Sequence, residues 1–174
     1  MIRVYYTKVQ EHESVEAHEL LAKLLRQEYG IYEPELCTGL MGKPYLRSGP
    51  FFSISHSKGI AAVAFSEHPI GLDLEQERTV GKNVPLRVMS PEEYRSYCEH
   101  GCNVEDFLTL WTLKEAYFKY LGTGLHGGLN RTTFYYDSGW KLKASRCVFQ
   151  VFRDKKMFTA LCSCEQEKII RTFL

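Results

Sequence analysis

Two carboxylates, Asp73 and Glu75, stand two residues apart in the segment PIGLDLE, residues 69–75. The segment alternates between aliphatic and other residues. This pattern predicts a strand with the aliphatic side chains on one face and the two acids, together with Gly71, on the other. We expect the aliphatic face to anchor the strand in the core and Gly71 to leave room for a ligand. Paired acids of this kind could serve phosphate chemistry, sugar chemistry or only a solvated edge.

A second group of charges lies in FLTLWTLKEAYFKYL, residues 107–121, where apolar residues cover most of a predicted helix. Its only charges are Lys114, Glu115 and Lys119. Charges on a largely buried helix must be paired, bound to metal or directed into a cavity. The plainest alternative is an ion pair between Glu115 and Lys119, worth about 0.2–0.5 kcal/mol. In that reading the stem of Lys114 extends to solvent.

The strand and the helix together predict a site for phosphate and a divalent cation. Three carboxylates within ~4 Å of one another repel by about 4 kcal/mol per pair at an effective dielectric of 20. Asp73, Glu75 and Glu115 therefore need a cation between them. Mg²⁺ fits better than zinc, because it prefers carboxylate oxygens and the sequence has no cysteine or histidine pair with zinc-site spacing.

The segment FFSISHS, residues 51–57, offers groups that could hold a phosphate. Ser55 and His56 lie at the end of this predicted strand, and Lys58 with Gly59 follows. Hydroxyls, an imidazole and an ammonium group can all donate hydrogen bonds to phosphate oxygens. We expect this strand end to lie near the acids.

These residues are expected on an α+β framework without internal repeats. The first part of the chain predicts one strand, a helix that follows Ser14 and ends at Gly30, and a meander of short strands. In the second part, Ser90 and Glu93 form a capping box that starts a helix. A further helix covers roughly residues 105–121, and antiparallel strands follow to the end of the chain.

The bulk composition favours an ordinary cytoplasmic protein. The chain has 174 residues, of which 44% are hydrophobic, and its net charge of +1 gives no general attraction to nucleic acid. No apolar run reaches the roughly 20 residues of a membrane span, and the first residues lack the pattern of a secretion signal. The six cysteines have no CxxC spacing, which is typical of reduced thiols. We therefore expect no binding to nucleic acid or membrane.

Four motifs resemble, in their order, those of the 4′-phosphopantetheinyl transferases, specifically the Sfp-like (surfactin-type) group. They are GKPYL, FFSISHS, IGLDLE and WTLKEAYFKYLGTGL, at residues 42–46, 51–57, 70–75 and 111–125. The resemblance implies a holo-[acyl-carrier-protein] synthase type of enzyme that depends on Mg²⁺. Such an enzyme moves the 4′-phosphopantetheine arm of coenzyme A to a serine of an apo acyl or peptidyl carrier protein and releases adenosine 3′,5′-bisphosphate.

The resemblance also implies an architecture and a set of site residues. It implies a monomer with two similar α+β lobes, a pseudo-dimer of antiparallel sheets packed with helices. We place the lobes at residues 1–68 and 69–174, with coenzyme A in the cleft between them. The implied site residues are Asp73, Glu75 and Glu115 for Mg²⁺; Lys119 and Lys114 for the phosphates beside it; and Lys43, Ser55 and His56 for the nucleotide end and its 3′-phosphate.

Within this set, we expect Asp73, Glu115 and Lys119 to carry the catalysis. Glu115 is the candidate to take the serine proton, directly or through water, and Lys119 neutralises charge on the transferred and leaving phosphates. The first lobe is shorter than in many Sfp-like proteins. On its helix, Lys23 and Arg26 are the candidates for contacts with the 3′-phosphate.

Other functions stay open on the residues alone. A Mg²⁺-dependent phosphate-ester hydrolase or nucleotidyl transferase would also use carboxylates with lysines. A metal-free pair of the glycosidase kind is possible, since alternate strand residues lie roughly 6.5 Å apart, although the lysines argue against it. The chain could also be a non-catalytic module that binds coenzyme A or a carrier protein.

Overall fold

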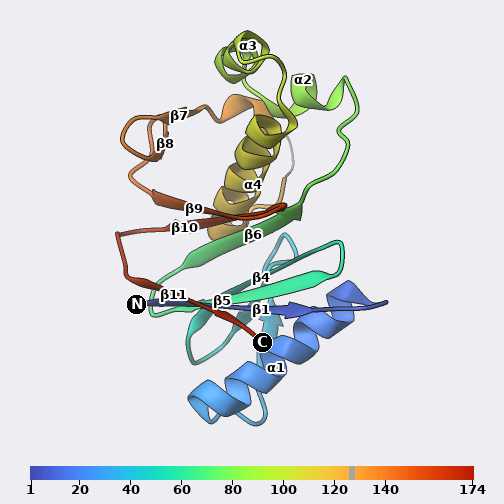
Figure 1. Cartoon of the computed structure of the whole chain (residues 1–174). Helices are drawn as coiled ribbons and strands as arrows, with labels where there is room; N and C mark the ends of the chain where they lie inside the picture. Colours follow the sequence, from blue (N-terminus) through green and yellow to red (C-terminus); the bar gives the residue numbers. More distant parts are fainter. Residues whose placement is uncertain (126–127) are drawn as a thin grey trace.

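The chain folds into four layers in the order helix, sheet, sheet, helix (Figure 1). The computed structural model describes residues 1–125 and 128–174. It confirms the predicted α+β class, with mainly antiparallel sheets packed against helices.

The first sheet packs on both of its faces. It has the strand order β11-β1-β5-β4. Alternation sends Tyr5, Val63 and Phe65 towards the leucines of helix α1, and the other face towards the second sheet. The elements are β1 (Ile2–Lys8), α1 (Glu13–Tyr29), β4 (Phe51–Ser57), β5 (Ile60–Ser66) and β11 (Ile169–Phe173).

The second sheet lies between the first sheet and helix α4 (Figure 1). Its strands are antiparallel in the order β6-β10-β9, with bounds β6 Ile70–Gln76, β10 Met157–Ser163 and β9 Val148–Asp154. As predicted, the aliphatic face of β6 joins the core, where it packs against Val4, Tyr6 and Ala62.

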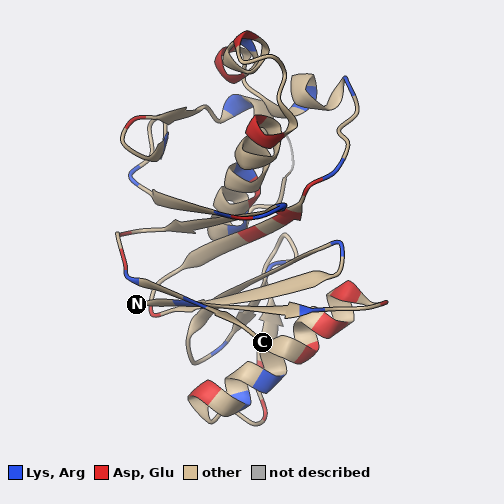
Figure 2. Ribbon diagram, in the orientation of Figure 1, with Lys and Arg blue, Asp and Glu red and all other residues tan. Residues whose placement is uncertain are grey.

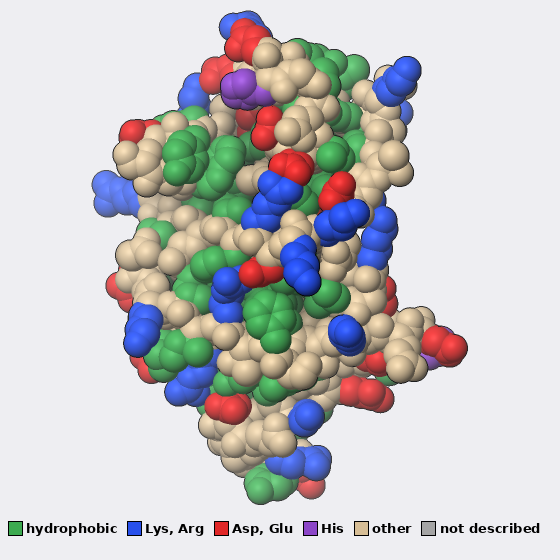
Figure 3. Space-filling view, viewed as in Figure 1, with side chains coloured by type: hydrophobic (Ala, Val, Ile, Leu, Met, Phe, Trp, Pro, Cys, Tyr) green, Lys and Arg blue, Asp and Glu red, His purple; other side chains and the backbone are tan. Residues whose placement is uncertain are grey.

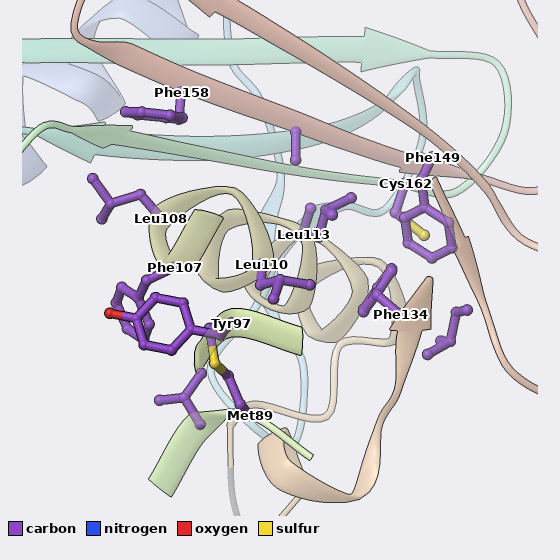
Figure 4. Packing of buried hydrophobic residues seen from close by; sticks show 14 residues of the cluster. Met89, Tyr97, Phe107, Leu108, Leu110, Leu113, Phe134, Phe149, Phe158 and Cys162 are labelled. Carbon is purple, nitrogen blue, oxygen red and sulfur yellow. The ribbon is translucent and has the colours of Figure 1, made fainter. Parts of the chain in front are cut away.

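Helix α4 (Val104–Leu121) is the centre of a second hydrophobic cluster. Phe107, Leu110 and Leu113 of this helix pack among side chains from the sheet and from the surrounding short elements (Figure 4). The helix is buried over most of its surface, as the sequence predicts. The short elements are β2 (Leu36–Thr38), β3 (Pro44–Leu46), α2 (Val84–Val88), α3 (Pro91–Glu99), a 3₁₀ helix (Leu129–Arg131), β7 (Phe134–Tyr136) and β8 (Trp140–Leu142).

Helix boundaries follow the sequence signals closely. The capping box at α3 is confirmed: the Ser90 hydroxyl accepts from the backbone N–H of Glu93, and the Glu93 carboxylate accepts from that of Ser90. Gly30 ends α1 in the left-handed conformation, with φ of 66°. The start of α1 differs from the prediction, since the helix already includes Glu13 and no side chain caps it.

The last strand differs from the prediction in its pairing and in its place. β11 runs parallel to β1 and forms the edge of the first sheet, whereas we expected an antiparallel strand of the C-terminal lobe. The chain thus crosses between the sheets twice, after β5 and after β10. A division at residues 1–68 and 69–174 therefore leaves one strand of the first sheet in the second segment.

Charge is spread over the molecule. Figure 2 shows red acidic bands on β6 below the charged turns of α4, and Figure 3 shows basic and acidic side chains interspersed on the same face. Among the described residues, no helix is both long and apolar enough to span a membrane.

Candidate active site

A cavity of about 620 Å³ opens between strands β4 and β6, helix α4 and the turn that precedes β3. It collects residues from segments that are far apart in the sequence. Seven of the eight predicted site residues line it: Lys43, Ser55, His56, Asp73, Glu75, Glu115 and Lys119. The structure thus brings the predicted phosphate-binding residues and the predicted metal-binding acids to one cavity.

Gly71 sets how closely α4 crosses β6. A Cβ atom at this position would lie 1.9 Å from the carbonyl oxygen of Ala116 and 2.5 Å from the backbone nitrogen of Tyr120. The space that we expected to admit a ligand is therefore filled by the helix backbone. This close crossing places Glu115 and Lys119, which precede Ala116 and Tyr120, over the acidic face of the strand.

Asp73 is buried and only half satisfied. Its Oδ1 accepts hydrogen bonds from the Ser55 hydroxyl at 2.9 Å and from Lys119 Nζ at 2.7 Å, while its Oδ2 has no partner among the described residues. Burial raises the pKa of Asp73, and Lys119 opposes that rise. An orphaned carboxylate oxygen in a buried position is costly unless a ligand meets it.

Glu115 lies beside Asp73 and has no hydrogen bond or ion pair with any residue that the structure describes. Burial and the charge of Asp73 raise its pKa to about 7. The alternative of an ion pair between Glu115 and Lys119 is wrong, because Lys119 turns to Asp73 instead. Glu115 is thus a carboxylate free to take a cation or a proton.

Glu75 is held by three donors. Trp111 Nε1 donates to its Oε1 at 2.8 Å, Arg78 lies 3.4 Å from the same oxygen, and the Ser57 hydroxyl donates to its Oε2 at 3.0 Å. The sequence interpretation missed these partners. Ser57 continues the alternation of serines in β4, and this spacing was the signal that could have identified it.

Lys43 and His56 lie at the cavity on separate elements. Lys43 Nζ donates to the carbonyl of Ile70 at 2.9 Å, and burial lowers its pKa to about 8. His56 Nδ1 lies 3.3 Å from a carboxylate oxygen of Glu13. From α1 the cavity also receives Ser14 and His18, which the sequence interpretation did not select.

Lys114 contradicts its prediction. Its side chain is fully buried in the second cluster, where Nζ donates to the Glu93 carboxylate at 2.7 Å. The carbonyl oxygens of Leu129 and Thr132, at 2.7 and 2.6 Å, accept the remaining hydrogen bonds. Lys114 does not line the cavity and does not reach solvent, so it can contact neither coenzyme A nor its phosphates in this arrangement.

Lys23 and Arg26 also lie off the cavity. They line a separate depression on α1 together with Glu19 and Gln27. The helix turns the two basic residues away from the face that carries Ser14 and His18.

The donor set of the cavity fits Mg²⁺. Within the described ranges, the oxygens of Asp73, Glu75 and Glu115 do not all lie within 4.8 Å of one another, so they form an open arrangement. Mg²⁺ commonly takes one or two carboxylates and completes its shell with water and substrate phosphates. The orphaned oxygen of Asp73 and the unpaired Glu115 are suited to this. The group of exposed ligands at His68, Cys164 and Glu165 lies outside the cavity.

The chain is similar in sequence to a known protein family and to several of its members. The family model described as the 4'-phosphopantetheinyl transferase superfamily matches residues 69–168. A 4'-phosphopantetheinyl transferase of Bacillus subtilis is 31% identical over 129 residues, which are 71% of this chain and 58% of that protein. The 4'-phosphopantetheinyl transferase gsp of Aneurinibacillus migulanus is 33% identical over 92 residues, 51% of this chain and 38% of that protein.

A third relative is the 4'-phosphopantetheinyl transferase Sfp of Bacillus subtilis (strain 168), 28% identical over 71% of this chain and 58% of that protein. The chain thus spans about half the length of the curated relatives it matches. The family match itself covers more than half of the chain and includes Asp73, Glu75, Glu115 and Lys119. On this match, the chain belongs to the 4′-phosphopantetheinyl transferase superfamily.

Proposed function

We propose that this protein transfers the 4′-phosphopantetheine arm of coenzyme A to a serine of an apo acyl or peptidyl carrier protein, with Mg²⁺ as the metal. The observation that carries the proposal is the convergence of Asp73, Glu75, Glu115 and Lys119 on one cavity with the basic groups of the first lobe. The names of the relatives support the same reaction.

The first lobe binds the nucleotide end of coenzyme A. Lys43 and His56 reach the cavity from the turn before β3 and from β4, so they meet the phosphates of an extended ligand. Ser55 lines the same wall, with its hydroxyl proton donated to Asp73. His56 must exchange its contact with Glu13 for a phosphate oxygen. The pyrophosphate then lies towards α4, where Lys119 can donate to it.

The three acids of the cavity bind the cation, and one of them also accepts the proton. Asp73, Glu75 and Glu115 would hold Mg²⁺, which when bound would stabilise charge on the pyrophosphate oxygens. Glu115 takes the proton of the carrier serine, directly or through water, as the serine oxygen attacks the phosphorus that bears the pantetheine arm. The phosphoanhydride bond breaks, and adenosine 3′,5′-bisphosphate leaves. Lys119 neutralises the charge that develops on the leaving phosphate.

Three further properties belong to the proposal. The six cysteines are all free thiols in the structure, which supports a reducing compartment, the cytoplasm. Coenzyme A and the carrier protein are the partners, and nucleic acid and membrane are not. The protein acts as a monomer, because the cleft is lined from both lobes of one chain.

The test is direct. The protein is incubated with coenzyme A, Mg²⁺ and an apo carrier protein, and mass spectrometry looks for a phosphopantetheine-sized gain on the carrier. A gain that requires Mg²⁺ supports the transferase. Nucleotide breakdown without carrier modification supports a hydrolase, and binding of coenzyme A with neither product supports a non-catalytic module.

A variant at Glu115 separates the roles within the site. Glu115→Gln should lose turnover more than affinity for coenzyme A, because its amide cannot accept the serine proton. Calorimetry measures the affinity and the mass-spectrometric assay measures the turnover. A loss confined to affinity would contradict the role as a base.

A further inference from the structure

The two sheets are joined by a row of serine hydroxyl groups. β4 and β6 are edge strands of different sheets and lie side by side. The backbone N–H groups on the outer edge of β6 have no strand partner and would be unpaired. Serines of β4 accept their hydrogen bonds in three steps: Leu72 N to Ser53 Oγ at 2.9 Å, Leu74 N to Ser55 Oγ at 3.1 Å, and Gln76 N to Ser57 Oγ at 3.2 Å.

Two of the three hydroxyls have a second bond that points into the site. Ser55 donates to Asp73 at 2.9 Å, and Ser57 donates to Glu75 at 3.0 Å. The register is regular, because all three serines accept from the residue 19 positions later, and Ser55 and Ser57 donate to the residue 18 positions later. At Ser53 the corresponding residue is Gly71, which has no side chain to accept.

A hydroxyl bonded in this way is fixed in direction. Its oxygen accepts a hydrogen bond from a backbone N–H of β6. This bond restricts the directions in which the hydroxyl can donate its single proton. A carboxylate that accepts this proton is held in one rotamer. Charge-assisted bonds of this kind are stronger than neutral ones, and they strengthen further where water is excluded.

We propose that Ser57, with Ser55, is a positioning residue that orients the carboxylates for the divalent cation. The contact between the two sheets then sets the cation affinity of the site, and the strand that binds the nucleotide is mechanically connected to the strand that binds the metal. This inference rests on the proposed function, because it takes Asp73 and Glu75 as metal ligands. It assigns to Ser57 a role that does not require contact with substrate.

Direct cation binding tests the inference without measuring activity. Mn²⁺ is titrated into the protein with coenzyme A present and carrier protein absent, and the bound ion is followed by electron paramagnetic resonance. Trp111 gives a second readout, because its indole N–H donates to Glu75 and its fluorescence should respond when that carboxylate binds a cation. The chain has two tryptophans, so a Trp140→Phe background isolates this signal.

Three variants divide the structural role from the positioning role. Ser57→Ala should weaken Mn²⁺ binding on the order of 10-fold, the lower range for loss of a group that supports a metal ligand. Ser57→Thr keeps the hydroxyl and should restore affinity to within about 2-fold of the wild type. Ser53→Ala is the matched control: it removes the same kind of bond to a backbone N–H and no bond to a carboxylate.

The outcomes are distinguishable. The inference holds if Ser57→Ala and Ser53→Ala lower the melting temperature by similar amounts while only Ser57→Ala weakens cation binding. Equal Mn²⁺ affinity in these two variants, with normal binding in the wild type, overturns the positioning role and leaves the proposed function standing. A wild-type protein that binds no Mn²⁺ in the presence of coenzyme A overturns the metal site and the proposed function together.

Discussion

Helix α4 carries two lysine–carboxylate pairs, one fully buried and one partly exposed, that differ in how completely they are satisfied. Lys114 pairs with Glu93, whose two oxygens also accept from the backbone N–H groups of Ser90 and Phe134. Both oxygens of Glu93 and all three protons of the Lys114 ammonium group therefore have partners. Lys119 pairs with Asp73 at the same 2.7 Å distance, yet one oxygen of Asp73 has no partner in the part of the chain that the structure describes.

The difference teaches how to recognise a site among buried charges. A saturated pair has nothing left to offer a ligand, and it ties α3, α4 and the 3₁₀ helix together. An unsatisfied pair leaves unmet hydrogen-bonding capacity at a cavity wall, and this capacity supports the proposal that a ligand binds there. Sequence proximity to Glu115 made Lys114 look functional, whereas its partners show a structural role.

The largest effect is expected from a variant that breaks the pair of Lys114 and Glu93. Lys114→Met should lower the free energy of unfolding by about 3–5 kcal/mol, because it leaves the Glu93 charge buried without a cation and removes the donor to the Thr132 carbonyl. Chemical denaturation measures the change. Lys119→Met is the matched control and should cost about 1 kcal/mol or less, since its side chain is 30% exposed and Asp73 can take up a proton. Equal losses in the two variants would remove the distinction between the pairs.

The next effect concerns the unsatisfied pair. Asp73→Asn keeps an acceptor for Ser55 and Lys119 but removes the charge that a cation needs, so transfer to a carrier protein should fall by about 10²-fold or more. The free energy of unfolding should change by less than about 1 kcal/mol, because burial already disfavours the charged form. The mass-spectrometric assay gives the rate, with the exposed Asp137→Asn as control. Retention of most of the activity would exclude Asp73 from the site.

Sequence periodicity correctly predicted which faces of a strand or helix are buried, because these faces follow from the residues of that element alone. The alternation in β6 identified its core face, and the apolar wheel of α4 identified a buried helix. Periodicity could not choose partners for the charges on α4. Lys114 and Lys119 are five residues apart and project to different sides of the helix, so the partners depend on α3 and β6, which are distant in the sequence.

Two other features depended on contacts between distant segments. The parallel pairing of β11 with β1 joins the ends of the chain, and no local pattern distinguishes it from an antiparallel edge strand. Gly71 was recognised as a gap beside the acids, but the sequence could not tell whether a ligand or a helix fills it. In both cases the sequence predicted the type of element, and tertiary packing decided its neighbour.

A variant with an effect of intermediate size tests whether the close crossing of α4 over β6 is needed to bring the site residues together. Gly71→Ala forces a Cβ against the Ala116 carbonyl, so the helix must move, and overpacking of this kind costs about 1–3 kcal/mol. Because the helix carries Glu115 and Lys119 away from Asp73, transfer should also fall. Gly81→Ala is the control, since its nearest neighbour would be a Val84 methyl group at 3.5 Å. Gly71→Ala with normal stability and activity would show that the close crossing is not needed.

The smallest expected effect is a pH dependence of ligand affinity that arises from Lys43. Unlike the two α4 lysines, Lys43 has no carboxylate partner among the described residues, and it donates to the carbonyl of Ile70. Burial lowers its pKa to about 8, Cys162 opposes the shift and Lys119 adds to it. The folded protein therefore loses this charge near pH 8, whereas the unfolded chain keeps it to higher pH. An anion binds the charged form, so affinity for adenosine 3′,5′-bisphosphate should fall a few-fold as the pH rises above about 8.

The phosphates of that ligand are already fully ionised above about pH 7, since their second pKa is about 6. The decline must then come from the protein. Lys43→Arg keeps its charge throughout this range and should flatten the profile measured by calorimetry. The stability of the unliganded protein should change in the opposite direction and rise, because loss of the buried charge relieves its desolvation as the pH rises from about 8. A Lys43→Arg variant with the same decline as the wild type would assign the titration to another group.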